Sequence, residues 1–278
     1  MGYKTLVTMF RNPELDGAHL AAALELAERE GAHLNVLALG IERLPPETYF
    51  GGGTSILVQG AMSDALDDLA EAEAGAKAVL DNTTVPWGMQ TIAAPVGSVA
   101  QVLARFAALS DLVVMPQPYG PGRNAEDVAV VEAALFSSRT PMLVMPKGAS
   151  SCPDGKKIVI AWNQSTEALA AIRAALPMLK RAAEVDIAVV DPSQADGMAD
   201  PGTQLAELLS RHGVTVEISV VAKTMPKVSE VILRHIDDLG ADMLVMGAYG
   251  HSRFRESILG GTTRNMLEES EVPVLMAH

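Results

Sequence analysis

One pattern occurs twice in this chain and limits the folds that it can adopt. In the first half, SDLVVMPQPYG is followed by TPMLVMPKG; in the second half, ADMLVMGAYG is followed by VPVLMAH. Asp111 lies 30 residues before Pro141, and Asp242 lies 31 residues before Pro273. Similarity at one long period indicates a duplicated structural unit. We therefore predict two tandem domains, residues 1–149 and residues 150–278.

Each predicted domain alternates short apolar runs with segments of helical spacing. This order is typical of right-handed βαβ units, which form a parallel sheet with helices on both faces. Ligands of such sheets bind beyond the carboxyl ends of the strands, where the strand order reverses. The predicted strands are Lys4–Met9, His33–Leu39, Gln90–Pro95, Asp111–Met115, Pro141–Met145, Lys157–Trp162, Val185–Val190, Val214–Val221, Asp242–Met246 and Val272–Met276. The predicted helices include Gly17–Glu30 and Ala61–Leu80, and the glycine- and proline-containing segment Glu42–Gly60 is expected to be a surface loop.

A glycine-rich stretch follows the apolar run that begins at Asp242. Gly247 and Gly250 come directly after the run, and Gly260–Gly261 and Thr262–Thr263 precede a segment with helical character. Glycine lets backbone N–H groups approach a ligand closely, and a helix N-terminus presents free N–H groups and positive partial charge. The stretch therefore predicts a phosphate site.

Two structural explanations of these glycines stay open. Gly247 and Gly250 are also compatible with a tight turn, and Gly260–Gly261 with a helix C-cap followed by a new helix. The spacing lacks the GK[ST] ending of a Walker A loop and the compact GxGxxG of a dinucleotide fold.

The spacing G-x2-G-x9-G, followed by small residues and a final PVLM-type strand, resembles the nucleotide-binding signature of the universal stress protein family. This resemblance covers the whole chain, strongly in residues 156–278 and weakly in residues 1–148. It implies that each domain has a five-stranded parallel sheet of the Rossmann-like, adenine nucleotide alpha hydrolase-like type. It also implies that ATP or a related adenine nucleotide binds in the second domain, with or without Mg²⁺ on its phosphates.

The resemblance assigns further residues to this site. Asn163 takes the place of a family Asp and is equally compatible with a turn or N-cap before Ser165. Val190 is positioned to contact an adenine ring, although a strand valine is more often core. Arg253 can bind phosphate in bidentate fashion. Gly261 departs from the family, in which Ser or Thr is common, and Thr262–Thr263 can supply the hydroxyl instead.

The first domain lacks these features. Pro116-Gln117-Pro118-Tyr119 follows the strand where the second domain has Gly247-Ala248-Tyr249-Gly250, and the prolines have no N–H to donate, although Gly120 and Gly122 lie nearby. The acidic Glu126 and Asp127 lie where the second domain has Gly260–Gly261. We expect no nucleotide site of the usual kind in residues 1–148.

Composition excludes several other classes. The net charge of −13 disfavours nucleic acid and anionic membranes as partners. Cys152 is the single cysteine, so it forms no internal disulfide or thiolate metal cluster. The N-terminal residues do not resemble a signal peptide, and no apolar run approaches the roughly 18 residues of a membrane span, so we expect a cytoplasmic protein.

The leading hypothesis is a tandem universal stress protein that binds an adenine nucleotide and acts in stress response or regulation. No catalytic or metal-binding residue is predicted, and enzymatic activity is limited to slow ATP hydrolysis with Mg²⁺ and Thr263. The alternative is an interaction protein of the same fold that has lost nucleotide binding. Domain pairing within the chain is expected, and a homodimer is a further expectation.

Overall fold

The computed structural model describes residues 2–43, 55–192, 201–248 and 261–278. The strands are β1 (Thr5–Phe10), β2 (His33–Glu42), β3 (Trp87–Pro95), β4 (Leu112–Pro116), β5 (Met142–Met145), β6 (Lys157–Ala161), β7 (Glu184–Val190), β8 (Glu217–Val221), β9 (Met243–Gly247) and β10 (Val274–Ala277). The helices are α1 (Pro13–Glu30), α3 (Ser55–Leu80), η1 (Val96–Ser98), α4 (Val99–Ala107), α5 (Ala125–Ser138), α6 (Thr166–Leu179), α7 (Thr203–Arg211), α8 (Val228–Leu239) and α9 (Gly261–Glu269).

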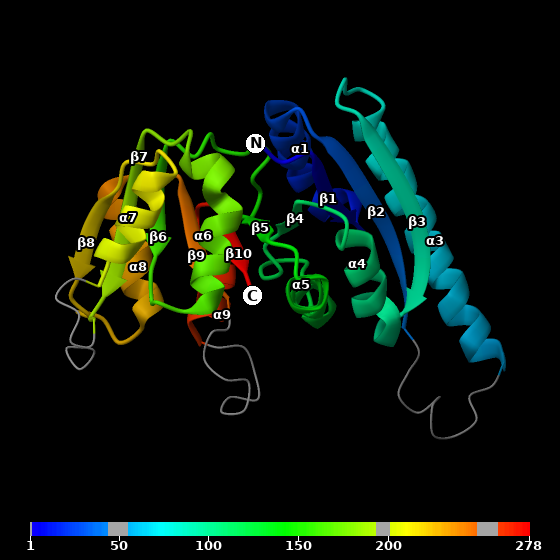
Figure 1. The fold of residues 1–278 in the computed structure, drawn as a ribbon. Coiled ribbons are helices and arrows are strands. Elements are labelled where there is room, and N and C mark those ends of the chain that lie inside the picture. Colours follow the sequence, from blue (N-terminus) through cyan, green and yellow to red (C-terminus); the bar gives the residue numbers. More distant parts are fainter. Residues whose placement is uncertain (1, 44–54, 193–200, 249–260) are drawn as a thin grey trace.

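All ten strands belong to one sheet, in the order β3-β2-β1-β4-β5-β10-β9-β6-β7-β8 (Figure 1). Within each half of the chain the neighbouring strands are parallel. The halves join where β5 pairs antiparallel with β10, with Leu143 opposite Leu275. The sequence predicted a five-stranded sheet in each domain and pairing of the two domains; in the structure each half contributes five strands to one continuous sheet.

The two halves repeat the same hydrogen bonds as well as the same element order. The Asp111 carboxylate accepts from the backbone N–H groups of Lys4 (2.6 Å) and Thr5 (2.9 Å). The Asp242 carboxylate accepts in the same way from Lys156 (2.9 Å) and Lys157 (3.0 Å). In each half an aspartate just before the fourth strand thus fixes the start of the first strand, as duplication of one unit predicts.

Helices cover both faces of the sheet. One face packs against α1, α3, α6 and α7, through residues such as Leu20, Ala72 and Leu209. The other face packs against α4, α5, α8 and α9, through residues such as Leu103 and Ile232. Because both faces are buried, the central strands consist of continuous apolar runs instead of alternating ones.

Two helices begin earlier than the sequence predicts. Helix α1 was expected from Gly17 but begins at Pro13, because Asn12 caps it and accepts from the N–H groups of Glu14 and Leu15. Helix α3 begins at Ser55, inside a segment that its glycines and prolines had marked as a loop. The first buried residue of α3 is Ala65, so its first turns extend beyond the sheet.

Side-chain contacts hold the two halves together on both sides of the β5–β10 pair. The Tyr3 hydroxyl donates to the carbonyl of Ala174 (2.7 Å), and Glu30 forms an ion pair with Arg181. The buried Gln117 side chain donates to the carbonyl of Ser270 (2.6 Å). No helix in the described part of the chain is long and apolar enough to cross a membrane.

A buried histidine lies under the first half of the sheet. The Thr8 hydroxyl donates to the Val114 carbonyl (2.9 Å) and lies 2.8 Å from His19 Nε2. Because that hydroxyl proton is used, His19 Nε2 carries a proton and donates to Thr8. Burial lowers the pKa of His19 to about 4, outweighing the attraction of nearby Asp16.

We predict that His19 makes the protein less stable in acid. Between pH 6.5 and about 4 the unfolded chain binds a proton that the folded chain excludes, so the free energy of unfolding falls as the pH falls through this window. The shift corresponds to a loss on the order of 3 kcal/mol. Denaturant unfolding measures the free energy of unfolding at pH 7 and at pH 4. The decrease between these two pH values should be smaller in His19→Gln than in the unmodified chain by this amount. Identical pH profiles for the two proteins would contradict the assignment.

Candidate functional site

The predicted site residues that the structure describes gather at one edge of the sheet. Strand β6 lies between β9 and β7, so the strand order reverses there. Asn163 follows β6, Gly247 ends β9 and Val190 ends β7. Because the three strands are parallel, these residues lie at the same carboxyl edge. Gly250, Arg253 and Gly260 lie outside the described residues.

Asn163 forms a turn that leads into α6. Its Oδ1 accepts from the backbone N–H of Ser165 (3.2 Å), and Ser165 in turn caps α6 by accepting from Ala168 N–H (3.1 Å). The side chain of Asn163 is exposed. Asn163 therefore forms the turn that was the alternative to a binding role, using its side-chain oxygen. Its side-chain nitrogen lies at the carboxyl edge of the sheet. Its contact with a nucleotide stays a prediction.

Gly247 has a packing role. A Cβ atom there would collide with the backbone nitrogen of Ala168 and lie 2.8 Å from the carbonyl carbon of Glu167. No real side chain fits at such distances, so only glycine lets β9 lie directly against the N-terminus of α6. This close approach also brings the end of β9 beside the loop that contains Asn163.

The N-terminus of α9 carries no carboxylate in its first turn. It begins with Gly261, which is exposed, and no described residue lies within 4 Å of the position that a side chain would take there. Thr262 is half-buried, whereas Thr263 is 4% exposed. The positive end of the helix dipole favours an anion at this point, and Thr262 is the more accessible of the two hydroxyls.

Sequence reasoning missed a polar group beside this helix end. In the orientation that satisfies both ends of its amide, Asn265 accepts from Ser229 Oγ (2.9 Å) and Lys227 Nζ (3.2 Å) and donates to the Gly261 carbonyl (3.2 Å). Asn265 therefore joins the start of α9 to the start of α8 and places an ammonium group close by. No motif marks these residues, since they come from different segments.

The N-terminus of α6 is already neutralised. Glu167 lies in its first turn, and the pKa of this carboxyl is lowered, chiefly by a hydrogen bond from its own backbone N–H and also by the hydroxyls of Thr166 and Ser165. The Glu167 carboxylate and Ser165 accept hydrogen bonds from the backbone N–H groups that an anion would otherwise use. Of these two neighbouring helix ends, α9 is the one suited to a phosphate.

The corresponding place in the first half is filled by ion pairs. Arg11, which follows β1 as Asn163 follows β6, pairs with Glu126 (3.1 Å) and Asp127 (3.3 Å) at the start of α5. Asn124 caps α5, and Asp127 completes a capping box. The carboxylates that the sequence singled out thus occupy the helix end that would otherwise attract a phosphate.

Two more arginines extend this network. Arg123 pairs with Asp16 (2.8 Å) and Asp127 (3.3 Å), and Arg43 pairs with Glu126 (2.9 Å). A cavity of about 130 Å³ remains between these groups and the ends of β1 and β2. The expectation that residues 1–148 hold no usual nucleotide site stays a prediction, and this network gives it a physical reason.

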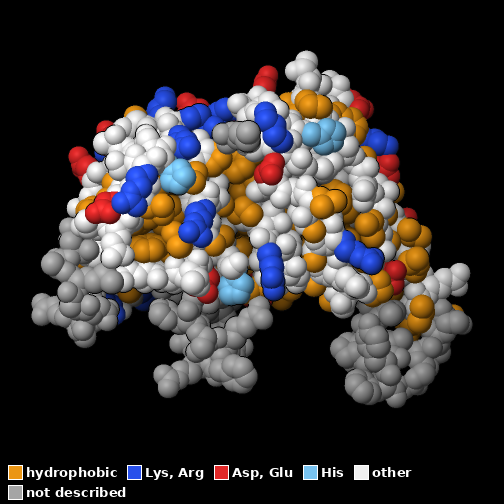
Figure 2. All heavy atoms as spheres, in the orientation of Figure 1, with side chains coloured by type: hydrophobic (Ala, Val, Ile, Leu, Met, Phe, Trp, Pro, Cys, Tyr) orange, Lys and Arg blue, Asp and Glu red, His pale blue; other side chains and the backbone are white. Residues whose placement is uncertain are grey.

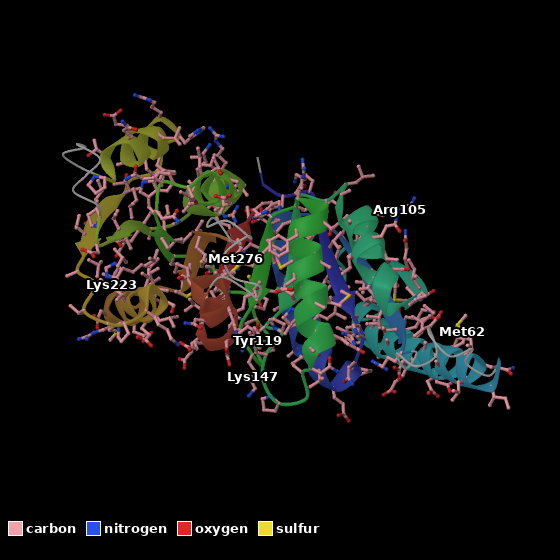
Figure 3. The ribbon with its side chains drawn as sticks, turned by 90° about the horizontal axis from the view of Figure 1, so that it is seen from below. Met62, Arg105, Tyr119, Lys147, Lys223 and Met276 are labelled. Carbon is pink, nitrogen blue, oxygen red and sulfur yellow. The ribbon has the colours of Figure 1, made fainter. Side chains whose placement is uncertain are left out.

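An aromatic contact ties the two halves together near the site. The guanidinium of Arg264, on α9, lies 5.9 Å from the ring centre of Tyr119, in the loop after β4. Figure 3 shows Tyr119 and Lys147 near one another in the middle of the molecule. The first half therefore helps to position the helix whose N-terminus forms the candidate site.

Comparison with known proteins agrees with this geometry. Residues 155–278 match the Universal stress protein family. Over 156 residues the chain is 29% identical to a universal stress protein of Synechocystis sp., covering 53% of this chain and 50% of that protein. A universal stress protein of Methanocaldococcus jannaschii is 36% identical over 47 residues, covering 17% of this chain and 29% of that protein. The chain thus spans half or less of the length of each of these relatives.

Solved structures of universal stress proteins share the overall fold. One from Archaeoglobus fulgidus superposes with a TM-score of 0.70 at 16% identity, covering 98% of this chain and 97% of that chain. A putative universal stress protein from Pseudomonas aeruginosa gives 0.59 at 18% identity, covering 98% and 92%. At such low identity these likenesses show the fold alone.

The described residues contain no group of three or more His, Cys, Asp or Glu side chains that could hold a metal ion. Cys152 is buried, and burial raises the pKa of its thiol. Its Sγ lies 3.2 Å from a guanidinium nitrogen of Arg29, so in this structure it belongs to the packing between the halves.

We predict opposite effects on stability at two glycines of this site. Gly247→Ala should lower the free energy of unfolding by about 1–3 kcal/mol, because the methyl group collides with the α6 backbone. Gly261→Ala should leave it unchanged or raise it by about 0.4–1 kcal/mol, because the space there is open. Denaturant titrations of both variants test this. Equal losses in the two would show that the packing of Gly247 is not special.

Proposed function

We propose that the chain binds ATP or a related adenine nucleotide at the carboxyl edge of β6, β7 and β9. The observation that carries the proposal is the N-terminus of α9, which has no acidic residue in its first turn and, among the described residues, no neighbour within 4 Å of a side-chain position at Gly261. The family match of residues 155–278 supports it, because it covers this edge and helix.

In this proposal each part of the nucleotide has a partner. The α9 N–H groups and Thr262 bind the phosphates, helped by the positive charge of Lys227. Asn163 hydrogen-bonds to the adenosine, and Val190 contacts the adenine ring. Gly250, Arg253, Gly260 and Thr263 belong to the same proposed site, and Mg²⁺ can accompany the phosphates.

We also propose that residues 1–149 and 150–278 are two domains of the universal stress type in one cytoplasmic protein, with a role in stress response or regulation. The repeated hydrogen bonds of Asp111 and Asp242 support this duplication. The ion pairs of Arg11 support a first domain without a nucleotide. In this account the first domain positions α9 and does not bind nucleotide itself.

A second candidate is an interaction protein of the same fold without nucleotide. The turn made by Asn163 favours it, since the side-chain oxygen is already used. Gly261 favours it as well, because the hydroxyl common in the family is absent there.

The test is calorimetric titration of Mg-ATP into the full chain and into Gly261→Asp. We expect micromolar binding at about one site per chain, and at least tenfold weaker binding in the variant, because the new carboxylate repels phosphate. The substitution should not unfold the protein, since acidic residues stabilise helix N-termini.

Gly60→Asp is the matched control, because Gly60 is also an exposed helical glycine with open space around it. It should bind like the unmodified chain. Absence of binding in the unmodified chain, together with no nucleotide carried through purification, would reject the proposal in favour of the interaction protein.

A further inference from the structure

The two edges of the ten-stranded sheet differ in their protection. Strand β8, at one edge, has five residues and carries the charged Glu217. Strand β3, at the other edge, has nine residues, WGMQTIAAP, and no charge. No charged residue occurs anywhere in residues 82–104. Proteins usually protect an exposed edge strand with charges or by keeping it short, and β3 has neither feature.

The unused backbone groups of β3 can be identified from its pairing. Leu34 N–H donates to the Pro86 carbonyl and lies opposite Trp87. In a parallel ladder, alternate residues face one neighbour, so the even-numbered residues of β3 face β2. Trp87, Met89, Thr91 and Ala93 therefore direct their N–H and C=O groups outward. Within the described residues none of these groups has a hydrogen-bond partner.

The helix that lies beside β3 exposes an apolar flank on the same side. Gly75 marks the flank of α3 that faces α1, since a Cβ there would meet Pro13. Leu66 lies nine residues earlier, about two and a half turns, and therefore on the opposite flank. Met62 shares that flank, and both side chains are exposed, at 42% for Met62 and 48% for Leu66. Figure 2 shows hydrophobic side chains along the side where α3 and β3 lie.

Most acidic residues of α3 lie on the flank opposite Leu66. Asp64, Asp68 and Glu71 lie eleven, seven and four residues before Gly75, and therefore on the flank toward α1. On the flank of Leu66, Glu73 is neutralised by Lys77 (2.6 Å). The β3 edge, Met62 and Leu66 thus form a side with few charges, since the strand has none and Glu73 is paired with Lys77; the exposed Asp81 lies just past the end of the helix.

We infer that this side, which we call the β3 face, is a docking surface for a second copy of the chain. A partner must match an uncharged strand edge beside an apolar helix flank, and the β3 face of another copy has that composition. Antiparallel pairing of β3 with its counterpart forms a twofold interface and places the two α3 helices side by side on one face of the sheet. The acidic flanks of α3 then point away from the interface.

The size of this face sets the expected affinity. Nine strand residues span about 30 Å, and one strand with one helix is about 15 Å deep, so each copy buries roughly 450 Å². The total of about 900 Å² is below the standard interface of about 1,600 Å², which indicates a weak, concentration-dependent dimer. Figure 3 shows Met62 at the opposite end of the molecule from Lys223, and this dimer therefore extends the sheet from one end.

Sedimentation velocity of the full chain, from about 5 µM to about 500 µM, tests the inference. We expect a shift from monomer to dimer across this range. Thr91→Lys places a charge on the exposed edge, and Leu66→Glu places one on the helix flank; each should weaken the dimer at least tenfold. Val220→Lys is the matched control, since Val220 is 60% exposed on the opposite edge strand and the substitution adds the same charge.

Three results would overturn the inference. The first is that the chain stays monomeric at the highest concentration. The second is that neither Thr91→Lys nor Leu66→Glu changes the stability of the dimer. The third is that Val220→Lys weakens the dimer as much as Thr91→Lys does. Far-ultraviolet circular dichroism of each variant confirms that the fold is kept.

Discussion

The antiparallel pairing of β5 with β10 is the contact on which the rest of the architecture depends. It joins the last strand of each repeat, and so removes one exposed edge from each half and turns two half-sheets into one. The ladder is short, with three residue pairs, and is reinforced by Gln117 with Ser270 and by Tyr3 with Ala174. Neighbouring strands rotate by roughly 20° each, so ten strands turn through about half a circle. This explains why β3 and β8 point the same way in Figure 1 although the halves are antiparallel where they meet.

One scaffold carries two different chemical environments at equivalent places. In the second half, α9 begins with Gly261 and two threonines and has no acidic residue in its first turn. In the first half, the first turn of α5 contains Glu126 and Asp127, whose charges are balanced by Arg11 and Arg123. A helix N-terminus favours negative charge close to it. The first half supplies it from its own side chains, and we propose that the second half takes it from a nucleotide.

Much of the fold followed from the sequence, because apolar runs and helical spacing report burial directly. The repeat from Asp111 to Pro141 predicted that the two halves share one order of elements along the chain. Pairing of the two halves was expected, but the antiparallel register of β5 against β10 could not be predicted, since it depends on contacts between residues more than 100 positions apart. The start of α3 at Ser55 was missed because glycine and proline nearby suggested a loop. At the site, Asn265 and Lys227 come together only through folding, and the packing role of Gly247 depends on the α6 backbone.

The central claim is that one of two duplicated units is built to bind a nucleotide. Hydrogen–deuterium exchange of the full chain with and without Mg-ATP tests it most directly. The account predicts slower exchange at the start of α9 and in the loop after β6, and unchanged exchange in residues 11–16 and 120–127. Equal protection in the first half, or protection there alone, would contradict it.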